Sequence, residues 1–218
     1  MSGLFETIRV REGRVPFVAR HVSRLTASCR ALGVAEPEPG VAERIEAHAT
    51  GDLIVRLTID GRGERIETRQ VPPAAPMRVV FSGTRHVPYD HKSTDRAVSD
   101  RARSRVVPYR ADEAILLTQD GYLAEGCVTN VFFWHAGELC TPALDLGILP
   151  GVGRARVFEV AKERGIGVRE GHFTKAEFEG LPIFLVNAVR GIMETTVHGE
   201  WRLSTDDRTR ALADRFWG

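Results

Sequence analysis

The sequence predicts an α+β protein of two lobes, a small N-terminal α+β lobe and a larger C-terminal lobe with a mostly antiparallel sheet. Within the first 70 residues, a helical repeat of apolar residues is followed by two strand-like segments. The proline-rich stretch VPPAAP (71–76) then interrupts regular structure, because proline cannot donate ladder hydrogen bonds. Mixed strands and helices follow, an order typical of an α/β lobe. We expect a small lobe at 1–80, a linker at 81–90 and a large lobe at 91–218.

The small lobe is expected to contain a long amphipathic helix. Apolar residues recur at helical spacing over 18–32, and Gly33 follows where a left-handed cap is favoured. His21, Arg24 and Ser28 share the other face of this helix, near the strand FETIRV (5–10).

A second helix and a hairpin complete the expected small lobe. The second, shorter helix is predicted over about 38–49. The segment DLIVRLTI (52–59) alternates like a strand, and Asp60-Gly61 predicts a hairpin turn into ERIETRQV (64–71).

The large lobe is expected to alternate between strands and helices. The sequence predicts strands at 77–81, 114–118, 128–134 and 183–187, and helices at 95–106, after Pro150 and ending near Phe216. The sequence contains no internal repeat and no low-complexity tract.

Composition excludes several function classes. The 218 residues are 43% apolar and carry 30 basic against 29 acidic side chains, so no strong net charge attracts nucleic acid or a membrane surface. The N-terminus is charged from its sixth residue, and no stretch approaches the roughly 20 apolar residues that span a bilayer. We therefore expect a cytoplasmic protein. Its three cysteines are far apart and are expected to be small buried residues, with no metal site.

Four motifs carry candidate chemistry: ARHVSRL (19–25), YDHKSTDR (89–96), GYLAEGCVTNVFFW (121–134) and GILPGVGRAR (147–156). Individually each is weak, because a lone lysine such as Lys92 is usually exposed and a lone Glu125 is usually a solvated turn residue. The glycines of GVGRAR do not form a dinucleotide fingerprint, since Arg156 occupies the place of the third glycine.

Together these motifs resemble the class IV (branched-chain and D-amino acid) aminotransferase family. In that family a lysine in an HK(S/T)xxR-like stretch is followed by an EGxxTN(V/L)F strand and a G(I/L)LPGxxR turn, and here Glu125 follows Lys92 by 33 residues. A further family-like strand, FLVNAVRGI, occupies 184–192. The resemblance implies a two-lobed fold with a pseudo-barrel sheet in a large cofactor-binding lobe, pyridoxal 5'-phosphate as cofactor, and a homodimer.

The resemblance also assigns roles to residues. Lys92 is implied as the Schiff-base lysine and proton carrier, which suits an amine whose pKa is lowered by desolvation. Glu125 is implied as the partner of the pyridine nitrogen, which a carboxylate keeps protonated. The expected strand places Cys127 and Thr129 on the same side as Glu125 by period-two alternation, so the Thr129 hydroxyl can reach the ring or phosphate.

The phosphate needs fixed donors. A helix start after Pro150 offers the free N–H groups of Val152 and Gly153, the latter where relatives often have threonine. Ala188 is implied as a further N–H donor and Arg24 as a guanidinium donor. The alternative for Arg24 is a role as a surface salt-bridge partner.

Within the family, the motifs are most similar to lyases that convert 4-amino-4-deoxychorismate to 4-aminobenzoate and pyruvate. That reaction proceeds through aldimine formation, deprotonation by Lys92 and elimination. Its small-molecule amine substrate carries two carboxylates, for which Arg9 and Arg190 are candidates, while Phe5 and Tyr89 are candidates to line the pocket. Ordinary surface arginines and a core tyrosine are the alternatives.

Other functions stay open at this point. A branched-chain or D-amino acid transaminase would use the same cofactor residues, and an inactive relative would act only as a binding module. The arginines of 92–110 could bind nucleic acid, but interspersed aspartates lower the local charge and no aromatic stacking pattern accompanies them.

Overall fold

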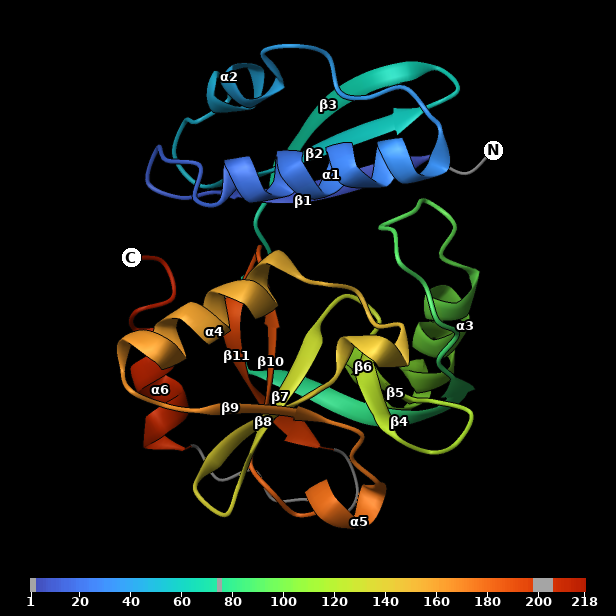
Figure 1. The fold of residues 1–218 in the computed structure, drawn as a ribbon, viewed down its shortest axis with the longest axis vertical. Helices are drawn as coiled ribbons and strands as arrows, with labels where there is room; N and C mark the ends of the chain where they lie inside the picture. Colours follow the sequence, from blue (N-terminus) through green and yellow to red (C-terminus); the bar gives the residue numbers. More distant parts are fainter. Residues whose placement is uncertain (1–2, 74–75, 198–205) are drawn as a thin grey trace. The chain divides into compact units, whose positions relative to one another are not determined.

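The chain forms two compact units, whose helices and strands are labelled in Figure 1. The computed structural model describes residues 3–73, 76–197 and 206–218. The first unit comprises Met1–Pro73 and Asp90–Arg96, and the second comprises Ala74–Tyr89 and Ala97–Gly218. Each has its own hydrophobic core.

This division differs from the expected one on both sides of the predicted linker at 81–90. Strand β4 (Met77–Arg85) continues through the first half of that range and belongs to the second unit. The segment 90–96 belongs to the first unit because it is bonded to β1 (Leu4–Val10) and the residue before it. Phe5 N–H donates to Lys92 O at 3.0 Å, and Thr94 N–H donates to Gly3 O at 2.7 Å.

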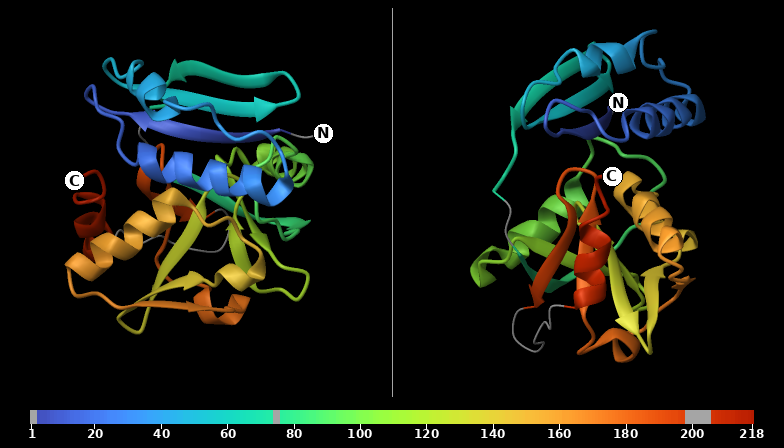
Figure 2. Two further views of the ribbon diagram at one scale, coloured as in Figure 1. Left: turned by 45° about the horizontal axis from the view of Figure 1, so that its top comes forward. Right: turned by 90° about the vertical axis from the view of Figure 1, so that its left-hand side faces the viewer.

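The first unit is a three-stranded antiparallel sheet in the order β1–β2–β3, with β2 at Leu53–Asp60 and β3 at Gly63–Gln70. Helix α1 (Val18–Leu32) packs along β1, and α2 (Val41–Glu46) packs against α1 (Figure 2). Alternation along the strands turns one face toward these helices. That face buries Leu4, Ile8, Val10, Val55, Leu57 and Ile59.

The predicted elements of this unit are largely confirmed. Helix α1 has the predicted bounds, and Gly33 caps it with φ 63° and an N–H bonded to Arg30 O. The hairpin turn also falls as predicted, since Asp60 pairs with Gly63. The helix expected over 38–49 is shorter, because Gly40 adopts φ 74° and the left-handed conformation delays the helix to Val41.

The second unit is built on an eight-stranded sheet in the order β6–β5–β4–β11–β10–β7–β8–β9. Its remaining strands are β5 (Glu113–Leu117), β6 (Leu123–Gly126), β7 (Asn130–His135), β8 (Glu138–Pro142), β9 (Val168–Gly171), β10 (Ile183–Asn187) and β11 (Gly191–Val197). Its helices are α3 (Ala97–Val106), α4 (Val152–Glu163), α5 (Lys175–Phe178) and α6 (Asp207–Ala213), with 3-10 turns η1 (Val107–Tyr109) and η2 (Leu144–Leu146).

The curled sheet confirms the predicted pseudo-barrel lobe. Among the described strands, four pairs are antiparallel and three, β11–β4, β4–β5 and β8–β9, are parallel. Helix α4 packs on β10, α6 on β11, and α3 on β4 and β5 (Figure 1). Aromatic rings fill one core of the unit, where Phe133 meets Phe173 edge-on at 4.9 Å between ring centroids.

Two predicted strands have different bounds in the structure. The segment 184–192 is a hairpin, because β10 ends at Asn187 and β11 begins at Gly191. The strand expected at 128–134 begins only at Asn130 and is preceded by a turn.

In the part of the chain that the structure describes, no helix is long and apolar enough to cross a bilayer.

Candidate active site

The first unit contains a buried ion cluster between β1 and α1. Glu6 is 1% exposed, and His21 Nδ1–H donates to its Oε2 at 2.7 Å. Arg24 donates Nε–H to Oε1 at 2.7 Å and Nη2–H to Oε2 at 2.6 Å. The predicted polar face of the helix therefore lies against the strand FETIRV, and the structure shows Arg24 as a salt-bridge partner of Glu6.

Charge pairing decides the ionisation of this cluster. Burial by itself raises the pKa of Glu6, but the charge of Arg24 and the hydrogen bonds from His21 and Arg24 outweigh it and lower that pKa to about 2. Burial lowers the pKa of His21, against the opposing effect of Glu6. The cluster therefore holds a carboxylate, a guanidinium and a neutral imidazole at neutral pH.

The opposite face of the same sheet carries Lys92. Its Nζ lies 4.8 Å from the centroid of the Phe5 ring, and Arg56 Cζ lies 3.9 Å from the same centroid. The structure thus brings together the predicted residues Lys92 and Phe5 and adds Arg56, which sequence reasoning missed. The sequence does contain a pattern that could have identified Arg56, because alternation in DLIVRLTI places it on the sheet face opposite Val55 and Leu57.

Arg9 lies on this face as well. Register pairs Phe5 with Thr58, Thr7 with Arg56 and Arg9 with Ile54, so these side chains share one side of the sheet. Arg9 Nη2 donates to Asp52 Oδ1 at 2.8 Å. Its Nη1 is buried with no hydrogen-bond partner among the described residues, so it can still donate to an anion.

Glu125, in the second unit, is held by the loop that precedes α4. It is 2% exposed, and its Oε2 accepts hydrogen bonds from Asn130 Nδ2 and Leu149 N–H, both at 3.2 Å. Asn130 Nδ2 also donates to Leu149 O at 3.0 Å. Asn130 was missed as a site residue, although it is the asparagine of the VTNVFF motif.

The expected continuous strand from Glu125 to Thr129 is wrong. Strand β6 ends at Gly126, whose N–H donates to Thr129 O at 2.8 Å to close a turn. Cys127 Sγ points to Ser99 O of α3, and the Thr129 hydroxyl donates to Glu113 Oε2 at 3.3 Å. Period-two alternation fails because the chain reverses direction, so Thr129 and Cys127 do not share a strand face with Glu125.

The first turn of α4 meets the end of β10. Gly151 precedes the helix in an extended conformation, so the N–H groups of Val152 and Gly153 begin the helix and have no acceptor within it. A Cβ on Gly153 would lie 2.7 Å from Asn187 C and 3.0 Å from Ala188 N. Glycine therefore lets the predicted donors Val152, Gly153 and Ala188 converge within one unit.

Tyr89 and Arg190 belong to the second unit, whereas Phe5 and Arg9 belong to the first. Tyr89 is 37% exposed, and its N–H donates to Gly147 O at 2.9 Å. Arg190 lies in the turn between β10 and β11, where its N–H donates to Asn187 Oδ1 at 2.8 Å.

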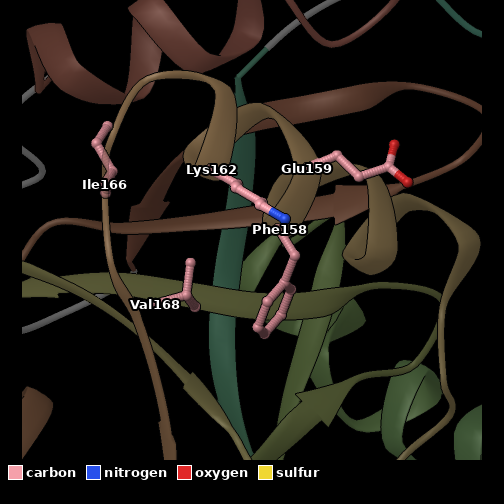
Figure 3. A pocket seen from close by; sticks show the side chains of 5 residues that line it. All are labelled: Phe158, Glu159, Lys162, Ile166 and Val168. Atoms are coloured by element: carbon pink, nitrogen blue, oxygen red, sulfur yellow. The ribbon is translucent and has the colours of Figure 1, made fainter.

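A cavity of about 280 Å³ lies beside the second half of α4 (Figure 3). It is lined by Phe158, Glu159, Lys162, Ile166 and Val168, and the Phe158 and Val168 side chains face it from α4 and β9 (Figure 3). None of the predicted site residues lines it.

Comparison with known proteins decides the family. A family model described as amino-transferase class IV matches residues 3–196. The chain belongs to the class IV aminotransferase family. Aminodeoxychorismate lyase of Bacillus subtilis is 47% identical over 62 residues, which cover 28% of this chain and 21% of that lyase.

Solved structures of class IV enzymes have the same fold. A branched-chain aminotransferase from the archaeon Thermoproteus uzoniensis, solved with norvaline, has a TM-score of 0.86 and 25% identity, covering 99% of this chain and 84% of that chain. A hypothetical aminotransferase from Mycobacterium tuberculosis, in a PLP-bound form, has a TM-score of 0.81 and 23% identity, covering 99% and 88%. The latter likeness concerns the fold alone.

Class IV aminotransferases are enzymes that depend on pyridoxal phosphate and act on amino acids, and this chain is one of them. Its residues fit the cofactor. Glu125 is a buried carboxylate held in one orientation, as a protonated pyridine nitrogen requires. The glycine-permitted approach of the α4 N-terminus to Ala188 provides N–H donors of the kind that bind phosphate.

Replacement of Glu6 by glutamine should lower stability at pH 7 by about 3 kcal/mol, because an Arg24 charge and a bonded imidazole lose their partner. In the unaltered protein, both depressed pKa values make stability fall with acid, from pH 6.5 for His21 and from pH 4.5 for Glu6. In the Glu6→Gln variant, the further fall of stability below pH 4.5 should be absent, because glutamine does not titrate. Urea unfolding at pH 7, 5 and 3 measures this.

Glu36→Gln is the matched control, because Glu36 pairs with Arg30 on the surface. We expect its stability profile to follow that of the unaltered protein. Equal acid sensitivity of Glu6→Gln and the unaltered protein would contradict the assigned role of Glu6.

Gly153→Ala should destabilise the second unit by about 1–3 kcal/mol and weaken cofactor binding, because the new Cβ forces Asn187 and Ala188 away from the helix. Thermal unfolding of the apoprotein and titration with pyridoxal phosphate measure both effects. Gly167→Ala is the control, since a Cβ there meets nothing within 4 Å. Unchanged cofactor affinity in Gly153→Ala would rule out the proposed convergence of donors.

Proposed function

We propose that this enzyme is a lyase that converts 4-amino-4-deoxychorismate to 4-aminobenzoate and pyruvate. The observation that carries the proposal is the cationic face of the first unit, where Arg56 and Lys92 both lie within 5 Å of the Phe5 ring centroid and Arg9 shares the sheet face. A substrate with two carboxylates suits such a face, because guanidinium groups bind carboxylates through paired hydrogen bonds.

The proposal assigns Lys92 as the amine that binds the cofactor aldehyde and Glu125 as the partner of its ring nitrogen. Val152, Gly153 and Ala188 are proposed to donate N–H groups to the phosphate. Arg24 is proposed to add its guanidinium and Thr129 its hydroxyl, although both already bond to carboxylates, Glu6 and Glu113.

Bound pyridoxal phosphate supplies the electron sink for the reaction. Lys92 is proposed to take the proton from the carbon that bears the substrate amine. The bond between the ring and the enolpyruvyl oxygen then breaks, and the departing enolpyruvate takes up a proton to become pyruvate. Arg9 and Arg56 hold the carboxylates, with Phe5, Tyr89 and Arg190 proposed to complete the substrate pocket.

A transaminase is the second candidate. The likeness to a branched-chain aminotransferase over nearly the whole chain supports it, and the cofactor residues serve amino transfer equally well. The two reactions differ after the same proton is removed, because elimination needs a leaving group next to that carbon and transfer needs a 2-oxo acid. Homodimeric assembly, which the family resemblance implies, and a cytoplasmic location, which the sequence predicts, belong to the proposal as well.

The reaction is tested with purified holoenzyme given 4-amino-4-deoxychorismate, and separately D- and L-amino acids with 2-oxoglutarate. We expect 4-aminobenzoate and pyruvate in equal amounts from the first, and little amino transfer in the second. Brisk transfer with no 4-aminobenzoate would instead establish the transaminase. Colourless protein that binds no pyridoxal phosphate would point to a binding module.

Lys92→Ala should abolish turnover, with about a 10³-fold or greater loss of kcat, because the variant lacks the proposed Schiff-base amine and proton carrier. Loss of the visible absorbance that borohydride fixes in the unaltered enzyme is the second measurement. Full turnover in this variant would refute the assignment of Lys92.

Arg56→Met should lower kcat/KM for the dicarboxylate substrate about 10- to 100-fold, because it removes a charged hydrogen-bond donor and keeps an apolar stem on Phe5. Cofactor affinity should be unchanged. Arg69→Met is the matched control, since Arg69 is exposed and pairs with Ile54 on the same sheet face. A similar loss in both variants would mean that only the general charge of this face matters.

A further inference from the structure

Glu113 is a buried carboxylate without a role in the proposed chemistry. It begins β5, is fully buried, and uses both oxygens as acceptors. Oε1 accepts N–H groups of Ala114 at 3.0 Å and Cys127 at 3.1 Å. Oε2 accepts Val128 N–H at 3.0 Å and the Thr129 hydroxyl at 3.3 Å. Three of these four donors belong to the turn at 126–129, which we call the β6–β7 turn.

The β6–β7 turn connects to candidate cofactor residues on two sides. On one side it separates Glu125 from Asn130, which must fold back to bond to each other. On the other side, Val128 O accepts Asn187 Nδ2–H at 3.3 Å. Asn187 in turn accepts the N–H groups of Val189 and Arg190, and so shapes the backbone next to Ala188.

The packing of Gly126 gives independent support. A Cβ at this position would overlap the Thr129 hydroxyl and lie 3.1 Å from Glu113 Cγ. The turn therefore closes directly around the Glu113 side chain, and glycine is required for that approach.

Only a carboxylate satisfies this set of donors, because it accepts on both oxygens and donates on neither. A glutamine would place an NH₂ group against Val128 N–H or Cys127 N–H and lose at least one bond. Burial raises the pKa of Glu113, while the N–H groups of Val128 and Ala114 oppose that change.

We propose that Glu113 is a positioning residue for the cofactor: by holding the β6–β7 turn, it orients Glu125 toward the ring nitrogen and Asn187 toward the phosphate donors at Ala188. This inference rests on the proposed pyridoxal phosphate site. In this proposal Glu113 acts through the turn, because its four hydrogen bonds are all to protein groups of β5 and the turn.

The test compares Glu113→Gln with Thr141→Val in the full chain. Thr141 is also fully buried in the second unit, and its hydroxyl donates at 2.8 Å to Val131 O, which lies outside the turn at 126–129. We expect Glu113→Gln to weaken pyridoxal phosphate binding about tenfold and to shift the visible band of the bound cofactor. Thr141→Val should lower the apoprotein Tm by a similar amount and leave both cofactor readouts unchanged.

Amide hydrogen exchange of the apoprotein is the second measurement. The N–H groups of Cys127 and Val128 should exchange about tenfold faster in Glu113→Gln and at the original rate in Thr141→Val. Should Glu113→Gln not fold, Glu113→Asp keeps the carboxylate but shortens the side chain by one methylene, so it cannot reach all four donors, and a smaller loss of affinity in the same direction is expected.

Equal cofactor affinity in Glu113→Gln and the unaltered protein, or an equal loss in Thr141→Val, would overturn the positioning role while leaving the proposed function standing. Absence of any pyridoxal phosphate binding by the unaltered protein would overturn both. The two failures are therefore distinguishable.

Discussion

The β6–β7 turn imposes the strictest constraint on the second unit, because its N–H groups point into the protein and need an acceptor there. Glu113 supplies that acceptor from the neighbouring strand and closes the turn against Gly126. With the turn in place, Asn130 reaches back to Glu125 and forward to Leu149. One hydrogen-bonded network thus joins the three strands β5, β6 and β7 to the loop ahead of α4, and the candidate residues depend on its geometry.

The first unit also contains a buried polar group, and there an ion pair stabilises it. A buried carboxylate is unfavourable unless it is paired, and Glu6 obtains both a guanidinium fork and an imidazole N–H from one helix face. The cluster fixes α1 on β1, and β1 in turn holds the segment that carries Lys92 through the Phe5–Lys92 backbone bond. The lysine is therefore positioned by the sheet rather than by its own sequence neighbours.

Much of the first unit could be predicted from the sequence because its signals are local. The helix over 18–32 follows from apolar spacing and Gly33, and the hairpin follows from alternation and Asp60-Gly61. The family resemblance predicted the candidate residues of the cofactor site, but it gave Asn130 no role and did not include Glu113. Neither side chain has a local pattern that distinguishes it, since their partners come from other strands and loops.

The sequence by itself determined the two-lobed α+β fold, the family and the identity of Lys92 and Glu125 as candidates, because periodicity and motif order are properties of the chain. Only the tertiary structure decided that the chain turns between Glu125 and Thr129, that the Thr129 hydroxyl bonds to Glu113, and that Arg56 joins Lys92 at Phe5. The physical reason is that buried donors and charges choose partners by distance in space, and residues far apart in the chain provide them.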